Sequence, residues 1–85
     1  MANTFTLSVL TPEKTAFEGE VEYVEVPGTE GYLGVLANHA ALVTALASGT
    51  LTYRLPGGTT ETLNVSGGFF EVSKNRATVL ADALS

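Results

Sequence analysis

Residues 50–80 read TLTYRLPGGTTETLNVSGGFFEVSKNRATVL, and this stretch decides the fold class. Apolar and polar residues alternate along Thr50–Leu55, with Leu51, Tyr53 and Leu55 on the side that we expect to face inward. Pro56-Gly57-Gly58 is typical of a hairpin turn, and Thr59–Val65 then returns with the same period of two. A period of two between turn residues predicts paired β-strands.

The remainder of the stretch continues the pattern. Ser66-Gly67-Gly68 predicts a break at which backbones approach closely. Phe69–Ser73 and Arg76–Asp82 are then predicted strands on either side of Lys74-Asn75, a two-residue hairpin loop. The second half of the chain is therefore predicted to be a series of short antiparallel strands.

The first half of the chain also alternates between apolar and polar residues, with turn residues between the alternating segments. In residues 4–10, TFTLSVL, the side chains of Phe5, Leu7 and Val9 share one face, and Thr11-Pro12-Glu13-Lys14 reads as a type I turn. Along residues 20–26, EVEYVEV, Val21 and Tyr23 lie in one phase and Val24 and Val26 in the other, which indicates a β-bulge or a strand that twists between two sheets. Tyr32–Leu36 is a further short strand.

Only His39–Leu46 has a composition that favours helix, and at this length a helix is marginal, so we expect an extended segment or one loose turn. The whole pattern predicts an all-β protein. It would be a two-sheet sandwich or flattened barrel of about eight to ten short strands, forming one domain over residues 1–85 without a C-terminal helical hairpin.

The composition excludes several classes of function. Only 15% of the 85 residues are charged, 45% are apolar and the net charge is −5, so no basic face exists for nucleic acid or anionic lipid. There is no cysteine, and neither a signal peptide nor an apolar run of membrane-spanning length is seen. A small apolar domain of this kind often leaves apolar surface uncovered for a partner.

The residues that could carry chemistry do not form a recognisable catalytic set. His39 is the only histidine and has no spacing relation to Asp82, the only aspartate; Ser48, Ser66 and Ser73 lack a nucleophile-elbow motif. We expect no catalytic residue and no cofactor.

Two groups of residues have the spacing of binding motifs. Glu18, Glu20 and Glu22 would share one face of a strand and could bind Ca²⁺, although a solvated sheet face explains them more simply, so no metal site is expected. Gly28, Gly31 and Gly34 are not a phosphate-binding loop, because no lysine followed by serine or threonine accompanies them. A positive φ at Gly31 would place Glu30 and Tyr32 at the tip of a protruding turn suited to protein recognition.

The order and spacing of several motifs resemble the epsilon subunit of the bacterial and chloroplast F-type ATP synthase, the equivalent of the mitochondrial delta subunit. The similarity extends over essentially the whole chain. It rests on these segments: Thr11-Pro12-Glu13-Lys14, Phe17-Glu18-Gly19-Glu20-Val21, Pro27-Gly28-Thr29-Glu30-Gly31, Leu33-Gly34-Val35-Leu36, Asn38-His39-Ala40, Ser66-Gly67-Gly68-Phe69 and Thr78-Val79-Leu80-Ala81-Asp82.

The resemblance implies an N-terminal β-sandwich in the rotating central stalk, a non-catalytic subunit that couples ion-driven rotation of the c-ring to the gamma subunit. It implies that Glu30, Gly31 and Tyr32 face the c-ring loops. It also implies a gamma-facing side made by Thr11, His39, Leu42 and Thr44. The location implied is peripheral, on the cytoplasmic side of the inner (plasma) membrane within the F1 sector, held there through the complex without lipid insertion.

The chain departs from the family pattern in three places. Tyr32 stands where the family often has glutamate, and Ala37, Asn38 and Ala41 replace a Pro-Gly and a Pro around His39, which predicts a less rigid loop. Many bacterial members continue into a two-helix domain that regulates hydrolysis and binds ATP in some. The sequence ends at Ser85, and we expect no nucleotide site in it.

One alternative from a different class stays open at this point: a small β-sandwich module that binds a ligand such as a carbohydrate. Exposed aromatic side chains would favour it, and the candidates are Tyr23, Tyr32 and Tyr53. Tyr23 and Tyr53 fall on apolar strand faces and are expected to be buried.

Overall fold

A computed structural model describes residues 3–85 and shows seven strands and no helix in that range. The strands are β1 (Phe5–Leu10), β2 (Thr15–Val21), β3 (Tyr23–Gly28), β4 (Gly31–Leu36), β5 (Leu42–Arg54), β6 (Thr60–Ser73) and β7 (Arg76–Ala81). The prediction of an all-β sandwich is confirmed, but the predicted count of eight to ten strands is too high. No helix in residues 3–85 is long and apolar enough to cross a membrane.

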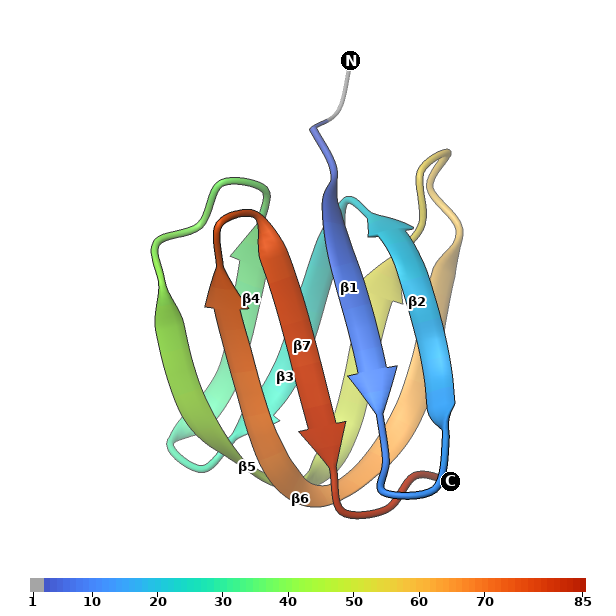
Figure 1. Cartoon of the computed structure of the whole chain (residues 1–85), viewed down its shortest axis with the longest axis vertical. Coiled ribbons are helices and arrows are strands. Elements are labelled where there is room, and N and C mark those ends of the chain that lie inside the picture. Colours follow the sequence, from blue (N-terminus) through green and yellow to red (C-terminus); the bar gives the residue numbers. More distant parts are fainter. Residues whose placement is uncertain (1–2) are drawn as a thin grey trace.

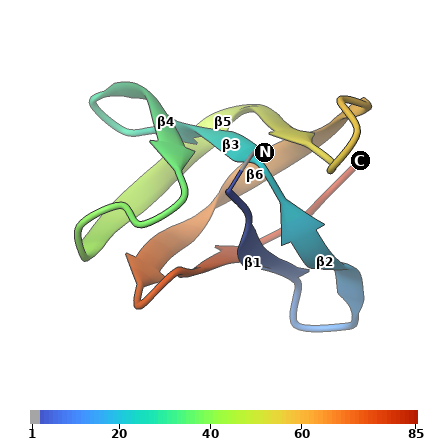
Figure 2. The ribbon, with the colours of Figure 1, turned by 90° about the horizontal axis from the view of Figure 1, so that it is seen from above.

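The seven strands form one hydrogen-bonded sheet in the order β2-β1-β7-β6-β5-β3-β4, which folds over into two layers (Figures 1 and 2). We call the layer of β2, β1, β7, residues 68–73 of β6 and residues 42–46 of β5 sheet I. Sheet II contains β4, β3, residues 48–54 of β5 and residues 60–66 of β6. All neighbouring strands are antiparallel except β1 and β7, which are parallel.

The overestimated strand count has a physical cause. The predicted break at Ser66-Gly67-Gly68 is wrong, because β6 continues through it and pairs with β5 on both sides. Gly67 and Gly68 have φ values of 78° and 127°, so the strand bends there and passes from one layer to the other without ending. Residues 42–46 are likewise extended and continuous with the rest of β5, which confirms the extended alternative for that segment.

The phase slip in residues 20–26 is the passage between layers. Val21 ends β2 with its side chain buried, Glu22 forms a bend, and Val24 and Val26 are buried from β3 in the other layer. The twist between two sheets is therefore the correct one of the two predicted explanations. The predicted turn at Pro56-Gly57-Gly58 and the two-residue loop Lys74-Asn75 are confirmed, and both loop residues of the latter have positive φ.

The core lies between the two layers and is apolar throughout the described residues, with no buried charged or polar side chain in 3–85. Its largest fully buried members come from three strands, β1, β5 and β6: Phe5, Leu7, Leu51 and Phe70, packed with valines of β1, β2, β3, β4, β6 and β7. Strand alternation places one residue in two in this core. The other half of each strand forms the two outer faces, which differ strongly in character.

Candidate interaction surface

An apolar row crosses the outer face of sheet I near one end of the sandwich. Leu10 pairs with Leu80, Leu80 with Phe69, and Phe69 with Ala45, so four strands contribute adjacent side chains. Phe69 is 59% exposed and Leu80 is 51% exposed, and Val43, one step along β5, is 66% exposed. Large apolar side chains gathered on one face of a small domain are typical of a surface that another protein covers.

A shallow hollow of about 230 Å³ deepens this row beside the β1–β2 turn. Its walls combine Leu10, Phe69 and Leu80 with Thr11 and Pro12 from the turn and Asp82 after β7. We call Leu10, Leu80, Phe69, Ala45 and Val43 the apolar row, and Thr11, Pro12 and Asp82 form its rim. A hollow that is apolar with one carboxylate at its rim suits an apolar side chain flanked by a hydrogen-bond donor.

The rest of the outer face of sheet I is polar. Val43 is followed across the sheet by Glu71, Thr78, Ser8 and Glu18, and the strand ends beyond them carry Arg76, Thr6 and Glu20. The face therefore changes from apolar to polar along the strands. A partner that covers all of it must place apolar groups over the one end and polar groups over the other.

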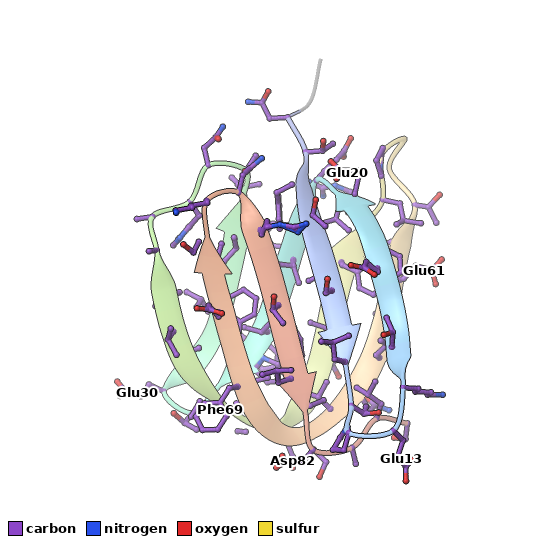
Figure 3. The ribbon with its side chains drawn as sticks, in the orientation of Figure 1. Glu13, Glu20, Glu30, Glu61, Phe69 and Asp82 are labelled. Carbon is purple, nitrogen blue, oxygen red and sulfur yellow. The ribbon has the colours of Figure 1, made fainter. Side chains whose placement is uncertain are left out.

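Glu20 is the best-anchored acid on this face. Its two carboxylate oxygens accept hydrogen bonds of 2.8 Å from the hydroxyls of Thr4 and Thr6. These two bonds, with a smaller contribution from Arg76, hold the pKa of Glu20 below its ordinary value. The carboxylate is thus charged and fixed in position, and Figure 3 shows it at the end of the sandwich away from Phe69.

The part of the outer face of sheet II formed by β5 and β6 is mostly hydroxylated. Thr52 and Thr62 stand side by side on β5 and β6, and Asn64 and Ser66 continue the polar line along β6. Tyr23 is half-buried there and is not a core residue, which corrects its predicted burial; its ring lies over Gly34, and Arg54 lies 5.5 Å from the ring centre. Arg54 also pairs with Glu22 at 3.3 Å. This part of the face is typical of one that remains solvated.

The Glu30 turn protrudes where β3 meets β4. Gly31 has φ of 127°, and Thr29, Glu30, Gly31 and Tyr32 are all exposed, so the expected protruding tip is confirmed. Glu30 lies at the same end of the molecule as Phe69, Asp82 and Glu13 (Figure 3). The backbone N–H of Thr50 donates a 3.1 Å hydrogen bond to the Tyr32 hydroxyl, so Tyr32 is tied to β5 as well as exposed.

The residues expected to face gamma do not form one cluster. His39 lies in the β4–β5 loop, and Leu42 and Thr44 are half-buried on β5 with their side chains opposite in direction to Val43. Thr11 lies across sheet I, beside the turn that follows β1. The apolar row connects the two locations, because it runs from Leu10, next to Thr11, to Ala45, next to Thr44.

Sequence reasoning did not single out Phe69, Leu80 or Val43 as surface residues. The signal was present as pairs of consecutive apolar residues, in which only one member of each pair can point into the core. Phe69-Phe70, Val79-Leu80 and Leu42-Val43 are such pairs, and in each one a side chain is left on the outer face or the layer edge.

No catalytic arrangement is assembled in residues 3–85. The Nδ1 atom of His39 lies 2.7 Å from the carbonyl oxygen of Ala40, and the loop that carries His39 is at the end of the sandwich away from Asp82 (Figure 3). Glu18 and Glu20 bind hydroxyls and Glu22 pairs with Arg54, and this part of the chain has no group of three potential metal ligands. The calcium alternative therefore has no geometric support.

The ligand-module alternative gains little from the structure. A hollow of about 590 Å³ is lined by residues 11–16, Leu63 and residues 82–85, which include no aromatic ring on which a sugar could stack. Tyr53 is buried, as expected, against Phe17 with ring centres 4.6 Å apart. The pKa of Tyr53 is raised, first because its hydroxyl is partly removed from water and second because the Glu61 carboxylate lies nearby.

Comparison with known proteins identifies close relatives. A sequence model of the family described as "ATP synthase, Delta/Epsilon chain, beta-sandwich domain" matches residues 4–85. The ATP synthase epsilon chain of Desulforamulus reducens is 50% identical over 82 residues, covering 96% of this chain and 61% of that one. The epsilon chain of Afipia carboxidovorans is 52% identical over 79 residues, covering 93% and 57%. This chain therefore spans about 60% of the length of the curated relatives that it matches.

Solved structures agree on the fold. A chain in the cryo-EM structure of the Euglena gracilis mitochondrial ATP synthase (OSCP/F1/c-ring, rotational state 1) has a TM-score of 0.91 at 25% identity and covers 96% of this chain and 52% of its own. A chain of the Tetrahymena thermophila mitochondrial ATP synthase central stalk and c-ring has a TM-score of 0.83 at 17% identity, covering 99% and 67%. The second likeness is one of fold alone.

Proposed function

The chain belongs to the ATP synthase delta/epsilon family, and on this premise we propose that it is a non-catalytic subunit of the rotating central stalk of an F-type ATP synthase. In this role it links the c-ring to the gamma subunit, so that rotation driven by ion flow through the ring reaches the catalytic head. The location that follows is the F1 sector on the cytoplasmic side of the membrane, held through its partners.

The apolar row on sheet I is the observation that carries this proposal. Phe69, Leu80 and Val43 are each more than half exposed on an otherwise well-packed sandwich, and their charged neighbours are Glu71, which pairs with Val43, and Asp82 at the rim of the hollow. Burying such side chains contributes about 1.5–3 kcal/mol each, which makes them natural anchors for a stable protein contact. The gamma subunit is the partner that the family supplies for such a surface.

The two expected contact regions fit different parts of the molecule. His39, Leu42, Thr44 and Thr11 border the apolar row at its two ends and form the proposed gamma-facing side with it. Glu30, Gly31 and Tyr32 form the proposed contact with the c-ring loops. Asp82 and Glu13 lie at the same end as Glu30 (Figure 3), so that end is acidic and suits loops that offer basic or hydrogen-bond-donating groups.

The fold is mechanically suited to transmit torque. β5 and β6 each run through both layers, so the two sheets share continuous backbone and cannot slide past each other without breaking strand pairing. The interior is apolar and close-packed, and close-packed interiors have low compressibility. A force applied at the Glu30 turn is therefore carried to the opposite layer through covalent strands.

Binding of a purified gamma subunit tests the proposal. The unmodified chain is expected to bind with measurable heat in titration calorimetry, and Leu80→Glu is expected to weaken binding at least tenfold because it places a charge in the buried centre of the contact. The control is Thr62→Glu, an exposed change on the opposite outer face that leaves binding unaltered. Absence of binding by the unmodified chain, or equal losses in both variants, would overturn the proposal.

A further inference from the structure

The two outermost strands of the folded sheet, β2 and β4, differ in how their free edges are protected. β4 is the last strand of the order in residues 3–85 and pairs only with β3, while β2 is the last strand at the other end and pairs only with β1. An unpaired edge offers a row of N–H and C=O groups to any other extended chain, and proteins usually block it with charges, proline or a bulge.

β2 carries such protection. Glu18 and Glu20 lie along it, and its pairing with β1 shifts register near the turn. β4, with the sequence GYLGVL, has no charged residue and no proline. The sequence in fact contains no Asp, Glu, Lys or Arg from Gly31 to Tyr53, so the β4–β5 loop and the edge of β5 beside it are uncharged as well.

The pairing of β3 with β4 determines which backbone groups are free. Pro27 has no N–H and stands opposite Tyr32, so these two cannot form a hydrogen-bonded pair. Hydrogen-bonded and non-bonded pairs alternate in an antiparallel ladder, which assigns Val26–Leu33 and Val24–Val35 to the bonded set. The N–H and C=O groups of Tyr32, Gly34 and Leu36 consequently point to the free edge.

The side chains of the same three residues give the edge its character. Tyr32 is 59% and Leu36 is 60% exposed, and both lie on the outer face of sheet II on either side of Gly34. Gly34 leaves room that the Tyr23 ring partly occupies, so the surface between the two exposed side chains is low and flat. An added strand could thus pair with the backbone while its own apolar side chains rest on Leu36 and over Gly34, which leaves the Tyr32 side chain to the proposed c-ring contact.

We propose that the free edge of β4 accepts an extended, uncharged and largely apolar segment of the gamma subunit as an additional strand of sheet II. This inference rests on the proposed function, because β4 leads directly through the His39 loop into the proposed gamma-facing side of β5. It adds to that function a mode of contact, in which backbone pairing at Tyr32, Gly34 and Leu36 supplements side-chain burial on the apolar row.

Residue-resolved amide hydrogen exchange on the full chain tests the proposal. In the free chain the amides of Leu33 and Val35 are expected to exchange slowly, and those of Tyr32, Gly34 and Leu36 rapidly. Saturation with purified gamma is expected to slow the second set at least tenfold, giving protection along all of β4. Gamma binding without that change would overturn the strand-addition proposal and leave the proposed function standing.

A pair of lysine substitutions gives an independent readout. Leu36→Lys places a charge beside the free edge of β4 and is expected to weaken gamma binding at least tenfold, whereas Ala16→Lys, an exposed change on the already charged β2 edge, leaves it unaltered. Equal affinities for the two variants would contradict the proposal. Protection of Tyr32, Gly34 and Leu36 that rises with protein concentration in the absence of gamma would show that a second copy of this chain occupies the edge, and would also overturn it.

Discussion

At the scale of single residues, Asn75 holds three separate segments together at one end of the sandwich. Its side-chain oxygen accepts a 2.8 Å hydrogen bond from the N–H of Asn38, and its side-chain nitrogen donates a 3.0 Å bond to the carbonyl oxygen of Thr4. Its own carbonyl oxygen accepts a 3.2 Å bond from Thr6. One residue of the β6–β7 turn thereby fixes both the lead-in to β1 and the loop that carries His39.

Substitution of Asn75 by glycine isolates this role, because glycine keeps the positive φ of 62° and removes only the carboxamide. We expect Asn75→Gly to lower the free energy of unfolding by about 1–2 kcal/mol, since two side-chain hydrogen bonds are lost. Lys74→Gly, at the neighbouring positive-φ position without such bonds, should change it by less than about 0.5 kcal/mol. Urea denaturation measures both, and equal effects would show that the carboxamide is unimportant.

Glu20 gives a prediction about pH. Removing one donor by Thr6→Val is expected to raise the pKa of Glu20 toward the ordinary value of 4.5, because the carboxylate loses one of the two bonds that favour its charged form. The folded-state pKa lies below the unfolded one, so the stabilisation by Glu20 is complete above about pH 4.5 and is lost as the pH falls through the lowered pKa. An NMR titration of the Glu20 carboxyl checks the shift, and identical midpoints in both proteins would contradict it.

At the scale of elements, the bend in β6 decides how one sheet becomes two layers. A Cβ atom on Gly68 would fall on the carbonyl oxygen of Leu80, and Gly68 also has a φ of 127°. Only glycine meets both conditions, so the approach of β6 to β7 depends on this position.

An alanine scan of two glycines tests the bend. Gly68→Ala is expected to destabilise the fold by more than about 3 kcal/mol, because the added methyl group collides with backbone that cannot move independently. Gly58→Ala is the matched control: Gly58 has a similar φ of 100° but open space around it, so only the backbone strain of about 1 kcal/mol remains. Thermal unfolding compares the two, and similar losses would refute the role of the close contact.

The sequence predicted the elements better than their connections. Alternation identified the core faces of β1, β5 and β6 because burial imposes a period of two, and turn residues marked the hairpins at Pro56-Gly57-Gly58 and Lys74-Asn75. The continuity of β6 was not predictable by the same rule, since a glycine pair can either end a strand or bend it. Only the partner strand decides, and β5 pairs with β6 on both sides of the bend.

Part of the candidate interaction surface has a signal in the sequence. The Glu30 turn was identified from Gly31, because glycine is the residue that most readily adopts a positive φ and so marks a sharp turn in a sequence. The apolar row was not, because it joins Leu10, Leu80, Phe69 and Ala45 from four strands whose register is a property of the folded sheet. The family resemblance supplied Thr11, His39, Leu42 and Thr44, and the structure adds the apolar residues that lie between them.

At the scale of the whole molecule, the protein is a rigid block with two unlike outer faces and one acidic end. The apolar row on sheet I, the hydroxylated surface of β5 and β6 on sheet II and the Glu30 turn are separate surfaces, each of which is open to a different neighbour. We expect the gamma subunit to cover the outer face of sheet I and to leave the part of the outer face of sheet II formed by β5 and β6 exposed.

Because the chain has no cysteine, single introduced cysteines can report on each face separately. The direct measurement is the rate of maleimide labelling of Leu80→Cys, Val43→Cys and Thr62→Cys, with and without a cysteine-free gamma subunit. We predict that gamma slows labelling at positions 80 and 43 at least tenfold and leaves position 62 unchanged. Protection at position 62 with free labelling at positions 80 and 43 would contradict the account.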